Sequence, residues 1–222
     1  MKECMKISNM YDLSHTKAKS LLEKHEYPWE VLPEISAFIL ELGATLDENE
    51  YEKRGENVWI AKDAKIYPNN YIAGPCIIGH NTEVRPGAFI RGNALVGDNC
   101  VVGNSTELKN VIIFDNVQVP HYNYVGDSVL GFKSHMGAGS ITSNVKQDKT
   151  NVTIKDDSEK IETGMRKFGA MLGDNVEVGC NTVMNPGTVI GRGSRIYPLS
   201  MVRGFVPANS IYKKLGEIAE IK

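Results

Sequence analysis

The chain has 222 residues, of which 41% are hydrophobic and 23% are charged, and its formal net charge is −2. This balance is typical of a folded globular protein and argues against a general affinity for nucleic acid or anionic membranes. We find neither a secretory signal at the start nor a run of about 18–20 apolar residues that would span a bilayer, and we expect a cytoplasmic protein.

Residues 1–57 predict a helical extension. The stretch SHTKAKSLLEKHE offers Ser14 as an N-cap, followed by small and aliphatic residues that share one helical face. A second helix is expected to begin at Pro28, which suits a first helical position, and to end at Gly43. We expect both helices to pack on the first coils of the following domain and to close that end, because open strand edges promote unwanted pairing.

Residues 58–207 carry a six-residue repeat. Every sixth residue is aliphatic, and the fifth residue of most units is small. The aliphatic positions of the first block are Ile60, Ile66, Ile72, Ile78, Val84, Ile90, Val96, Val102 and Leu108. After Leu108 the phase slips by one residue, and it slips again before Leu130. The second block continues with Leu172, Val178, Met184, Ile190, Ile196 and Val202.

This period of six does not fit an amphipathic helix, which needs apolar residues at intervals of three and four. It predicts an all-β fold, a parallel β-helix in which each unit forms one side of a triangular prism and three units complete a coil. The aliphatic side chain points inward and stacks on its counterpart in the next coil, about 4.8 Å away. The small fifth residue fits the turn between two sides.

Two segments depart from the repeat. Residues 142–168 interrupt it with a basic insertion, which we expect to protrude either as a solvated loop or as an arm over a neighbouring subunit and its site. Residues 208–222 form a C-terminal tail, for which we expect a short helix over the last coil. The four cysteines form no CxxC pair, and we expect them to be reduced, buried packing residues.

Arg91 and Lys109 are both second residues of their units and lie 18 residues apart, which is one full coil. They should therefore project from the same side in adjacent coils. Two cations at that distance repel by about 1–4 kcal/mol, and an anion between them would reverse this cost. Phosphate suits such a pair, because Arg binds it bidentately and Lys as a point charge. The alternative is an exposed pair with splayed side chains.

His121 follows Lys109 by twelve residues and should lie on a neighbouring side of the prism, near a corner shared with the basic pair. The preceding Pro120 stiffens the backbone there. An imidazole is well suited to accept a proton near neutral pH, so His121 is a candidate general base. A lone histidine is more often a surface residue, but Tyr124 and Asn144 nearby favour a site here.

Three segments, GNSTELKN, PHYNYVGDSVLG and MGAGSITSN, resemble the acetyltransferase domain of the bifunctional N-acetylglucosamine-1-phosphate uridyltransferase/glucosamine-1-phosphate acetyltransferase. The likeness is closest to the archaeal-type sugar-1-phosphate nucleotidyltransferases with amino-sugar acetyltransferase activity, and it extends over residues 10–215. The resemblance implies a left-handed β-helix of the hexapeptide-repeat acyltransferase superfamily. It also implies a homotrimer with sites shared between subunits, and acetyl-CoA as the acyl donor.

The resemblance implies roles for individual residues. His121 occupies the place of the general base. The implied substrate contacts are Arg91, Lys109, Tyr124, His135 and Asn144, and the implied cofactor contacts are Ala138, Asn144 and Cys180. Backbone N–H groups of residues 136–139 are candidates to stabilise an oxyanion. The implied reaction moves acetyl from acetyl-CoA to the amine of an amino-sugar 1-phosphate, either glucosamine-1-phosphate or galactosamine-1-phosphate.

Some positions depart from the family pattern. His135 and Val145 stand where the bacterial pattern has Asn and Tyr, and Pro120 replaces a glycine. These differences leave the identity of the sugar open. Residues 1–57 contain no glycine-rich nucleotide loop, so we expect that a separate nucleotidyltransferase would make the nucleotide sugar.

Two other functions fit parts of the sequence. His80, His121 and His135 invite comparison with γ-carbonic anhydrases, which are also trimeric left-handed β-helices, but zinc needs three imidazoles at about 2.0–2.1 Å. His80 has no second histidine at the spacing of such sites, and we expect no metal. The second alternative is a non-catalytic trimer that docks on a separate nucleotidyltransferase.

Overall fold

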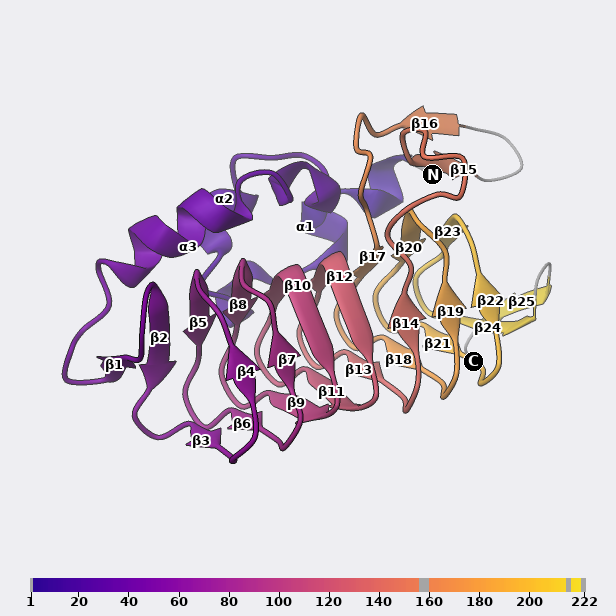
Figure 1. The fold of residues 1–222 in the computed structure, drawn as a ribbon. Coiled ribbons are helices and arrows are strands. Elements are labelled where there is room, and N and C mark those ends of the chain that lie inside the picture. The colour runs from indigo at the N-terminus through magenta and orange to yellow at the C-terminus, as the bar shows by residue number, and fades with distance from the viewer. Residues whose placement is uncertain (1, 156–159, 215–216, 221–222) are drawn as a thin grey trace.

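The computed structural model describes residues 2–155, 160–214 and 217–220. Its main body is a three-sided prism of short parallel strands that coil from one end to the other, with helices along one side (Figure 1). We name the three sides face 1, face 2 and face 3. The predicted all-β fold, a parallel β-helix with a helical N-terminal extension, is confirmed.

Face 1 and face 3 form one 14-stranded sheet, because β10 (Glu107–Ile113) and β12 (Tyr124–Leu130) bend from face 3 onto face 1. The other strands of face 1 are β2 (Val58–Ala61), β5 (Cys76–Ile78), β8 (Ala94–Val96), β17 (Ala170–Leu172), β20 (Thr188–Ile190) and β23 (Phe205–Val206). The other strands of face 3 are β4 (Tyr71–Ile72), β7 (Phe89–Ile90), β14 (Ile141–Thr142), β19 (Val183–Met184) and β22 (Met201–Val202).

Face 2 belongs to a separate nine-stranded sheet. Its parallel strands are β3 (Lys65–Ile66), β6 (Glu83–Val84), β9 (Val101–Asn104), β11 (Gln118–His121), β13 (His135–Met136), β18 (Glu177–Val178), β21 (Arg195–Ile196) and β24 (Ser210–Lys214). The interior between the three faces is filled by the aliphatic residues of the repeat, as the period of six predicted.

The register of the strands explains the phase slips in the repeat. Ile60, Ile78 and Val96 are paired across successive coils and are buried. Val96 then pairs with Ile113, and Ile113 with Leu130, so each of these two coils has 17 residues instead of 18. The slip is therefore the loss of one residue per coil, while the inward stacking continues.

The N-terminal extension runs along face 1. Its elements are η1 (Lys2–Met5), α1 (Ile7–Met10), η2 (Leu13–His15), α2 (Lys19–Leu22), η3 (Pro28–Val31) and α3 (Ile35–Gly43). Helix α3 packs on β5, β8 and β10, and η3 packs on β12 (Figure 1). The expectation that the helices close the first coils is thus wrong. The reason is that the outward residues of face 1, such as Ile77, Leu95 and Ile112, are apolar and need this cover.

The first strand covers the edge that the helices leave open. Strand β1 (Tyr51–Lys53) pairs antiparallel with β2, so the N-terminal edge of face 1 has a hydrogen-bonded partner. An unpaired edge would expose a row of N–H and C=O groups to other chains. The capping role assigned to the helices therefore falls to a strand.

The helix boundaries are partly as expected. Asp12, rather than Ser14, caps the first turn, because its carboxylate accepts a hydrogen bond from the N–H of Ser14 at 3.0 Å. Pro28 begins η3 and Gly43 ends α3, as expected. The expected single helix is divided near Pro33, which has no N–H to continue it.

The insertion between β14 and β17 forms a hairpin of β15 (Thr153–Lys155) and β16 (Lys160–Glu162). Val152 at its base is buried and faces Gly187 of the same chain, so the hairpin packs on the prism of its own subunit. The N–H of Phe168 donates to the carbonyl of Asn144 at 2.9 Å. The insertion therefore leaves and rejoins the prism at one point. Of the predicted loop 142–168, residues 156–159 lie outside the described residues.

The C-terminal tail forms strands, so the expected helix is wrong. Strand β24 continues face 2 and pairs antiparallel with β25 (Glu217–Glu220), which covers the last edge of that face. Of the tail, residues 215–216 and 221–222 lie outside the described residues. Within the described part of the chain, no helix has the length and apolar character needed to cross a membrane.

The cysteines divide into two kinds. Cys76 and Cys100 are buried at small positions of the repeat, as expected, and burial raises the pKa of each thiol to about 12. Cys4 and Cys180 are exposed, which corrects the expectation that all four would be packing residues. Cys4 lies in the extension and Cys180 at a corner of the prism, where no inward position holds either side chain.

Candidate active site

The corner between face 3 and face 1 collects most of the polar residues that the sequence singled out. Strands β10 and β12 turn this corner at Asn110 and Asp127, whose φ angles are 55° and 48°. Asn and Asp tolerate this left-handed conformation better than most residues do. Lys109 and Gly126, which precede them, are register partners, so the corner of one coil stacks on that of the next.

Arg91 and Lys109 are neighbours in adjacent coils, as the spacing predicted, since the N–H of Arg91 donates to the carbonyl of Leu108 at 2.9 Å. Each cation faces a carboxylate. The Arg91 guanidinium lies 2.6 Å from an oxygen of Glu107. The Lys109 ammonium lies 3.0 and 3.1 Å from the two oxygens of Asp127. The repulsion between the two cations is therefore offset by acidic side chains of the same chain.

Asp127 is the centre of a buried hydrogen-bond network and is only 3% exposed. Besides the ammonium of Lys109, its carboxylate accepts from the side-chain amides of Asn110 at 3.0 Å and Asn144 at 2.5 Å. The Asn144 amide also donates to the hydroxyl of Tyr124 at 3.1 Å. Three of the predicted substrate contacts are thus joined through one residue that the sequence argument left out. We call these five side chains the Asp127 network.

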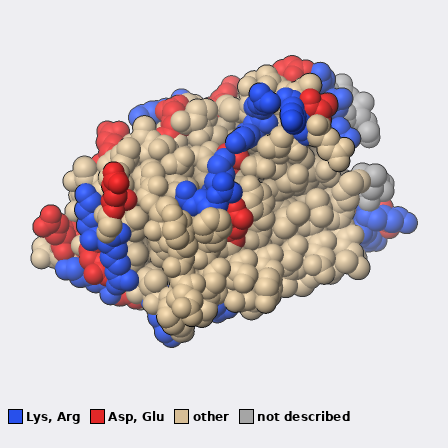
Figure 2. Space-filling view, viewed as in Figure 1, with Lys and Arg blue, Asp and Glu red and all other residues tan. Residues whose placement is uncertain are grey.

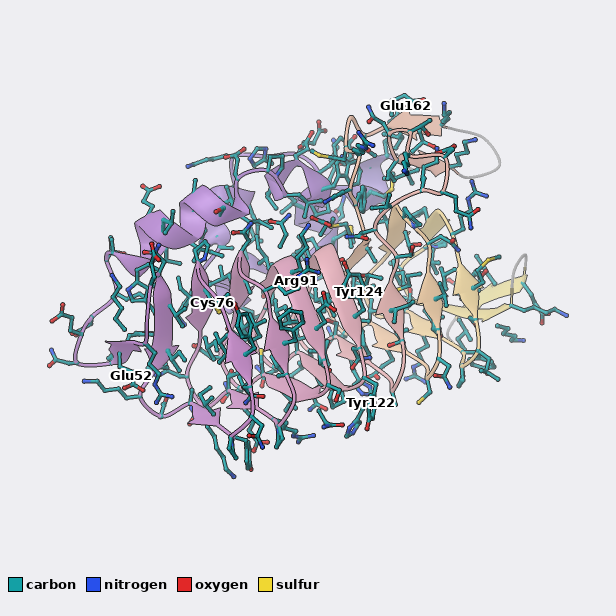
Figure 3. The ribbon with its side chains drawn as sticks, viewed as in Figure 1. Glu52, Cys76, Arg91, Tyr122, Tyr124 and Glu162 are labelled. Carbon is teal, nitrogen blue, oxygen red and sulfur yellow. The ribbon has the colours of Figure 1, made fainter. Side chains whose placement is uncertain are left out.

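Tyr124 lies over the start of β12. Its hydroxyl sits above Gly126, where a Cβ atom would collide with it, so the glycine makes room for the ring. Burial raises the pKa of Tyr124, and the charges of Asp127 and Glu107 raise it further. Figure 3 shows Arg91 and Tyr124 on the same face of the prism, with β10 between their strands.

His121 ends β11 on face 2, at the corner with face 3. Its register partner is Asn104 of the previous coil, and its carbonyl accepts the N–H of Gly139 in the next coil at 3.0 Å. The residue is exposed, and no side chain of the described residues hydrogen-bonds to the imidazole. Beneath it, Gly103 faces the backbone of Pro120 so closely that a Cβ would collide with it. His121 therefore lies one corner away from the Asp127 network, as the spacing predicted.

Ala138 and Cys180 continue the corner of His121 into the next two coils. The N–H of Asn181 donates to the carbonyl of Ala138 at 2.8 Å, and the N–H of Leu199 to the carbonyl of Cys180 at 2.9 Å. Both are corner residues at which the chain passes from face 2 to face 3. The predicted cofactor contacts Ala138 and Cys180 are thus brought into one column with His121, whereas Asn144 belongs to the other corner.

The candidate oxyanion donors are not all available. The N–H of Gly137 donates to the carbonyl of Val178 at 2.7 Å, and the N–H of Gly139 donates to the carbonyl of His121. The N–H of Ala138 has no acceptor within the described parts of the chain. Ala138 therefore offers the one backbone donor of residues 137–139 that a ligand can meet without breaking a coil hydrogen bond.

His135 lies apart from both corners. It begins β13 on face 2, and its Nδ1 lies 2.9 Å from a carboxylate oxygen of Glu177 in the next coil. It lines a surface pocket of about 340 Å³ with Gln118 and Lys133. Within one chain, the structure does not bring His135 to the Asp127 network.

The histidines proposed for a zinc site have separate surroundings. His80 Nδ1 lies 3.1 Å from both carboxylate oxygens of Asp63, while His135 faces Glu177 and His121 is exposed. Across residues 2–155, 160–214 and 217–220, no three His, Cys, Asp or Glu side chains are grouped to hold a metal ion.

Sequence reasoning missed Glu107 and Asp127, although their signals were present. Glu107 lies two residues before Lys109, which places both on the same side of a strand. Asp127 follows Lys109 by 18 residues, the spacing that had linked Lys109 to Arg91. Figure 2 shows the result as a band of Lys and Arg across the middle of this face, with acidic residues beside it.

Comparisons with known proteins agree with the resemblance read from the motifs. A bifunctional sugar-1-phosphate nucleotidylyltransferase/acetyltransferase of Sulfurisphaera tokodaii is 35% identical over 156 residues, which cover 70% of this chain and 39% of that protein. The bifunctional protein GlmU of Methanococcus maripaludis is 36% identical over 192 residues, covering 85% of this chain and 46% of that protein. The chain thus spans less than half the length of these curated relatives.

The model of one protein family matches the prism itself. The family is described as the GMPPB C-terminal domain, and its model matches residues 72–194, more than half of the chain. The matched region contains His121, both carboxylates and both cations of the corners described above. The chain therefore belongs to the family of the GMPPB C-terminal domain and carries the hexapeptide-repeat acetyltransferase fold that its motifs predicted.

Proposed function

We propose that the chain is an N-acetyltransferase that moves acetyl from acetyl-CoA to the amine of an amino-sugar 1-phosphate, glucosamine-1-phosphate or galactosamine-1-phosphate. The observation that carries this proposal is the paired arrangement of Arg91 with Glu107 and Lys109 with Asp127. The relatives named above, called sugar-1-phosphate nucleotidylyltransferase/acetyltransferase and GlmU, support the same reaction class.

The paired charges favour a ligand that carries both signs. The two cations and the two carboxylates at the corner sum to zero, so a simple anion gains little from the corner as a whole. An amino-sugar phosphate is a zwitterion: its phosphate would meet Arg91 and Lys109, and its ammonium group would meet a carboxylate such as Glu107. Charge-assisted hydrogen bonds of this kind are stronger than neutral ones and fix the orientation of the sugar.

His121 would act as the general base. It would take one proton from the ammonium group, and the freed amine nitrogen would attack the thioester carbonyl carbon. The new C–N bond forms, the C–S bond breaks, and the coenzyme A thiolate leaves and takes up a proton. The amine is itself the nucleophile, so no covalent intermediate on the enzyme is needed. The exposed imidazole, to which no described side chain is hydrogen-bonded, suits this role.

Acetyl-CoA would lie along the corner that His121 shares with Ala138 and Cys180. The N–H of Ala138, which meets no acceptor within the described residues, would donate to the thioester oxygen as negative charge develops on it. Cys180 is exposed and would contact the coenzyme, and Asn144 would lie where coenzyme and sugar meet. Because the donor is acetyl-CoA, a cytoplasmic location is part of the proposal.

A homotrimer is also part of the proposal. One row of outward side chains crosses face 3 in strand register: Tyr71, Phe89, Glu107, Tyr124, Ile141, Val183 and Met201. Tyr71 is 60% exposed and Met201 is 49% exposed. Large apolar side chains in a continuous row favour burial against another copy of the chain. The bifunctional relatives further support a separate nucleotidyltransferase as a partner.

The decisive experiment measures release of the coenzyme A thiol. Purified protein is mixed with acetyl-CoA and one of a panel of amino-sugar 1-phosphates, with glucose 1-phosphate, which has no amine, as the matched control. We expect turnover with an amino-sugar 1-phosphate and none with the control. Absence of turnover across the whole panel by a correctly folded trimer would contradict the proposal and favour a non-catalytic partner role.

A further inference from the structure

We propose that Asp127 is the positioning residue of this site: it holds Lys109 and Asn144 where they meet the substrate, and the N-terminal extension holds the network in turn. This inference rests on the proposed function. It concerns a residue that the substrate need not touch, because the Asp127 carboxylate is turned toward Lys109, Asn110 and Asn144.

The partners of Asp127 differ from those of a carboxylate that supports the fold. Among the described residues, every hydrogen bond to its carboxylate comes from a side chain. Asp174, which is buried as deeply at 1% exposure, instead accepts the backbone N–H groups of Asp12 at 2.7 Å and Phe132 at 2.9 Å. Asp174 therefore fixes the backbone, whereas Asp127 fixes functional side chains.

Removal of the Asp127 carboxylate would free both partners. Lys109 has a long side chain that is 25% exposed, and without its ion pair it would gain many rotamers pointing into water. The Asn144 amide would lose its shortest acceptor and keep only the Tyr124 hydroxyl. Both groups would then have to be ordered again when the substrate binds, which costs affinity.

The N-terminal extension reaches the network by two routes. The Asn110 amide, which donates to Asp127, also lies 3.2 Å from the carbonyl of Leu32. The Trp29 ring stacks on Phe168 at 5.7 Å, and the N–H of Phe168 donates to the carbonyl of Asn144. The extension thus contacts neighbours of the Asp127 network on both the β10 side and the β14 side.

The test compares Asp127→Asn and Asp127→Ala with Asp174→Asn as the matched buried control. We expect KM for the amino-sugar 1-phosphate to rise about 10- to 100-fold in Asp127→Ala and less in Asp127→Asn, which keeps an acceptor oxygen. KM for acetyl-CoA should change little. The control variant should lower Tm without changing either KM. An unchanged KM for the sugar phosphate in both Asp127 variants would overturn the proposal.

A second readout does not depend on turnover. The Asp127 charge contributes to the raised pKa of Tyr124, so the neutral Asn side chain should lower that pKa. The ultraviolet titration of each protein, minus that of its Tyr124→Phe counterpart, isolates this tyrosine. A Tyr124 titration that is identical with and without the Asp127 charge would contradict the network.

Failure of the proposed function would look different. In that case the wild-type protein would turn over no amino-sugar phosphate, while binding of inorganic phosphate could still be measured by calorimetry. Weaker phosphate binding in Asp127→Ala than in Asp174→Asn would then support the positioning role, and equal binding would refute it.

Discussion

The two corners that border face 3 are built from the same repeat, yet their side chains are arranged in opposite ways. At the corner with face 1, Lys109, Asp127 and Asn144 are bound to one another and largely buried. At the corner with face 2, His121 and Cys180 are exposed. The first corner is ordered before a ligand arrives, and the second keeps its reactive groups accessible.

This difference suggests how a simple solenoid can divide the labour of a reaction. Substrate orientation benefits from groups that are fixed in advance, because less order must be imposed on binding. Proton transfer needs a base with a free lone pair that is within reach of the substrate. If the proposed function holds, the corner with face 1 would bind the sugar phosphate and the corner with face 2 would carry the chemistry.

The largest expected effect is at His121. We expect His121→Ala to lower kcat by about 10²- to 10⁴-fold, since a general base contributes an effect of that size. The exposed side chain holds no part of the core, so Tm and oligomeric state should stay the same. The matched control is His80→Ala, which loses its contact with Asp63 but lies in an earlier coil. Wild-type turnover by His121→Ala would remove the division between the corners.

The binding corner should respond in KM. We expect Lys109→Ala to raise KM for the sugar phosphate by about 10- to 100-fold, because a hydrogen bond to a charged group is lost and Asp127 remains buried without its ion partner. Steady-state kinetics with each substrate in turn measure this change. Lys65→Ala on face 2 is the control cation. A change in kcat alone would assign Lys109 to the chemistry instead.

Gly103 tests whether the catalytic corner depends on close backbone packing. A Cβ at this position collides with the backbone of Pro120, so Gly103→Ala must displace the strand that carries His121. We expect destabilisation of about 1–3 kcal/mol together with a lower kcat. Thermal unfolding and kinetics check both. Gly55→Ala, which meets no atom within 4 Å, controls for the loss of a glycine at an open surface position.

The smallest effect is a pattern of thiol reactivity. Cys76 and Cys100, with a pKa of about 12, should remain unmodified at pH 8, because almost none of either thiol is ionised there. Cys4 and Cys180 are exposed and should react with a disulfide reagent. In a Cys4→Ser variant, added coenzyme A should slow the labelling of Cys180. Unchanged labelling at saturating coenzyme A would separate Cys180 from the cofactor site.

The sequence was most informative where one rule repeats. The inward aliphatic positions and the stacking of Arg91 on Lys109 follow from a fixed period, so they could be counted. Asp127 could have been found by the same count, but the argument sought an external anion and overlooked an internal one. The period says nothing about the tail, where hydrogen bonding to the edge of face 2 decided for strand β25.

The extension was harder to place because its helices are short and their apolar residues match face 1 only in three dimensions. The alternation of residues on face 1, with Ile77, Leu95 and Ile112 pointing outward, did signal that something covers that face. His135 shows the opposite limit. Its place in a family motif suggested a substrate contact, yet within one chain it faces Glu177 on face 2.

The single hydrogen bond between Phe168 and Asn144 closes the neck of the insertion and has an evolutionary consequence. Across that neck the ladder proceeds as if nothing had been added, because Leu130 pairs directly with Leu172. Descendants of this gene can therefore lengthen, trim or exchange the hairpin without altering the pitch of the solenoid. Variation can accumulate beside a site while the scaffold that supports it is left untouched.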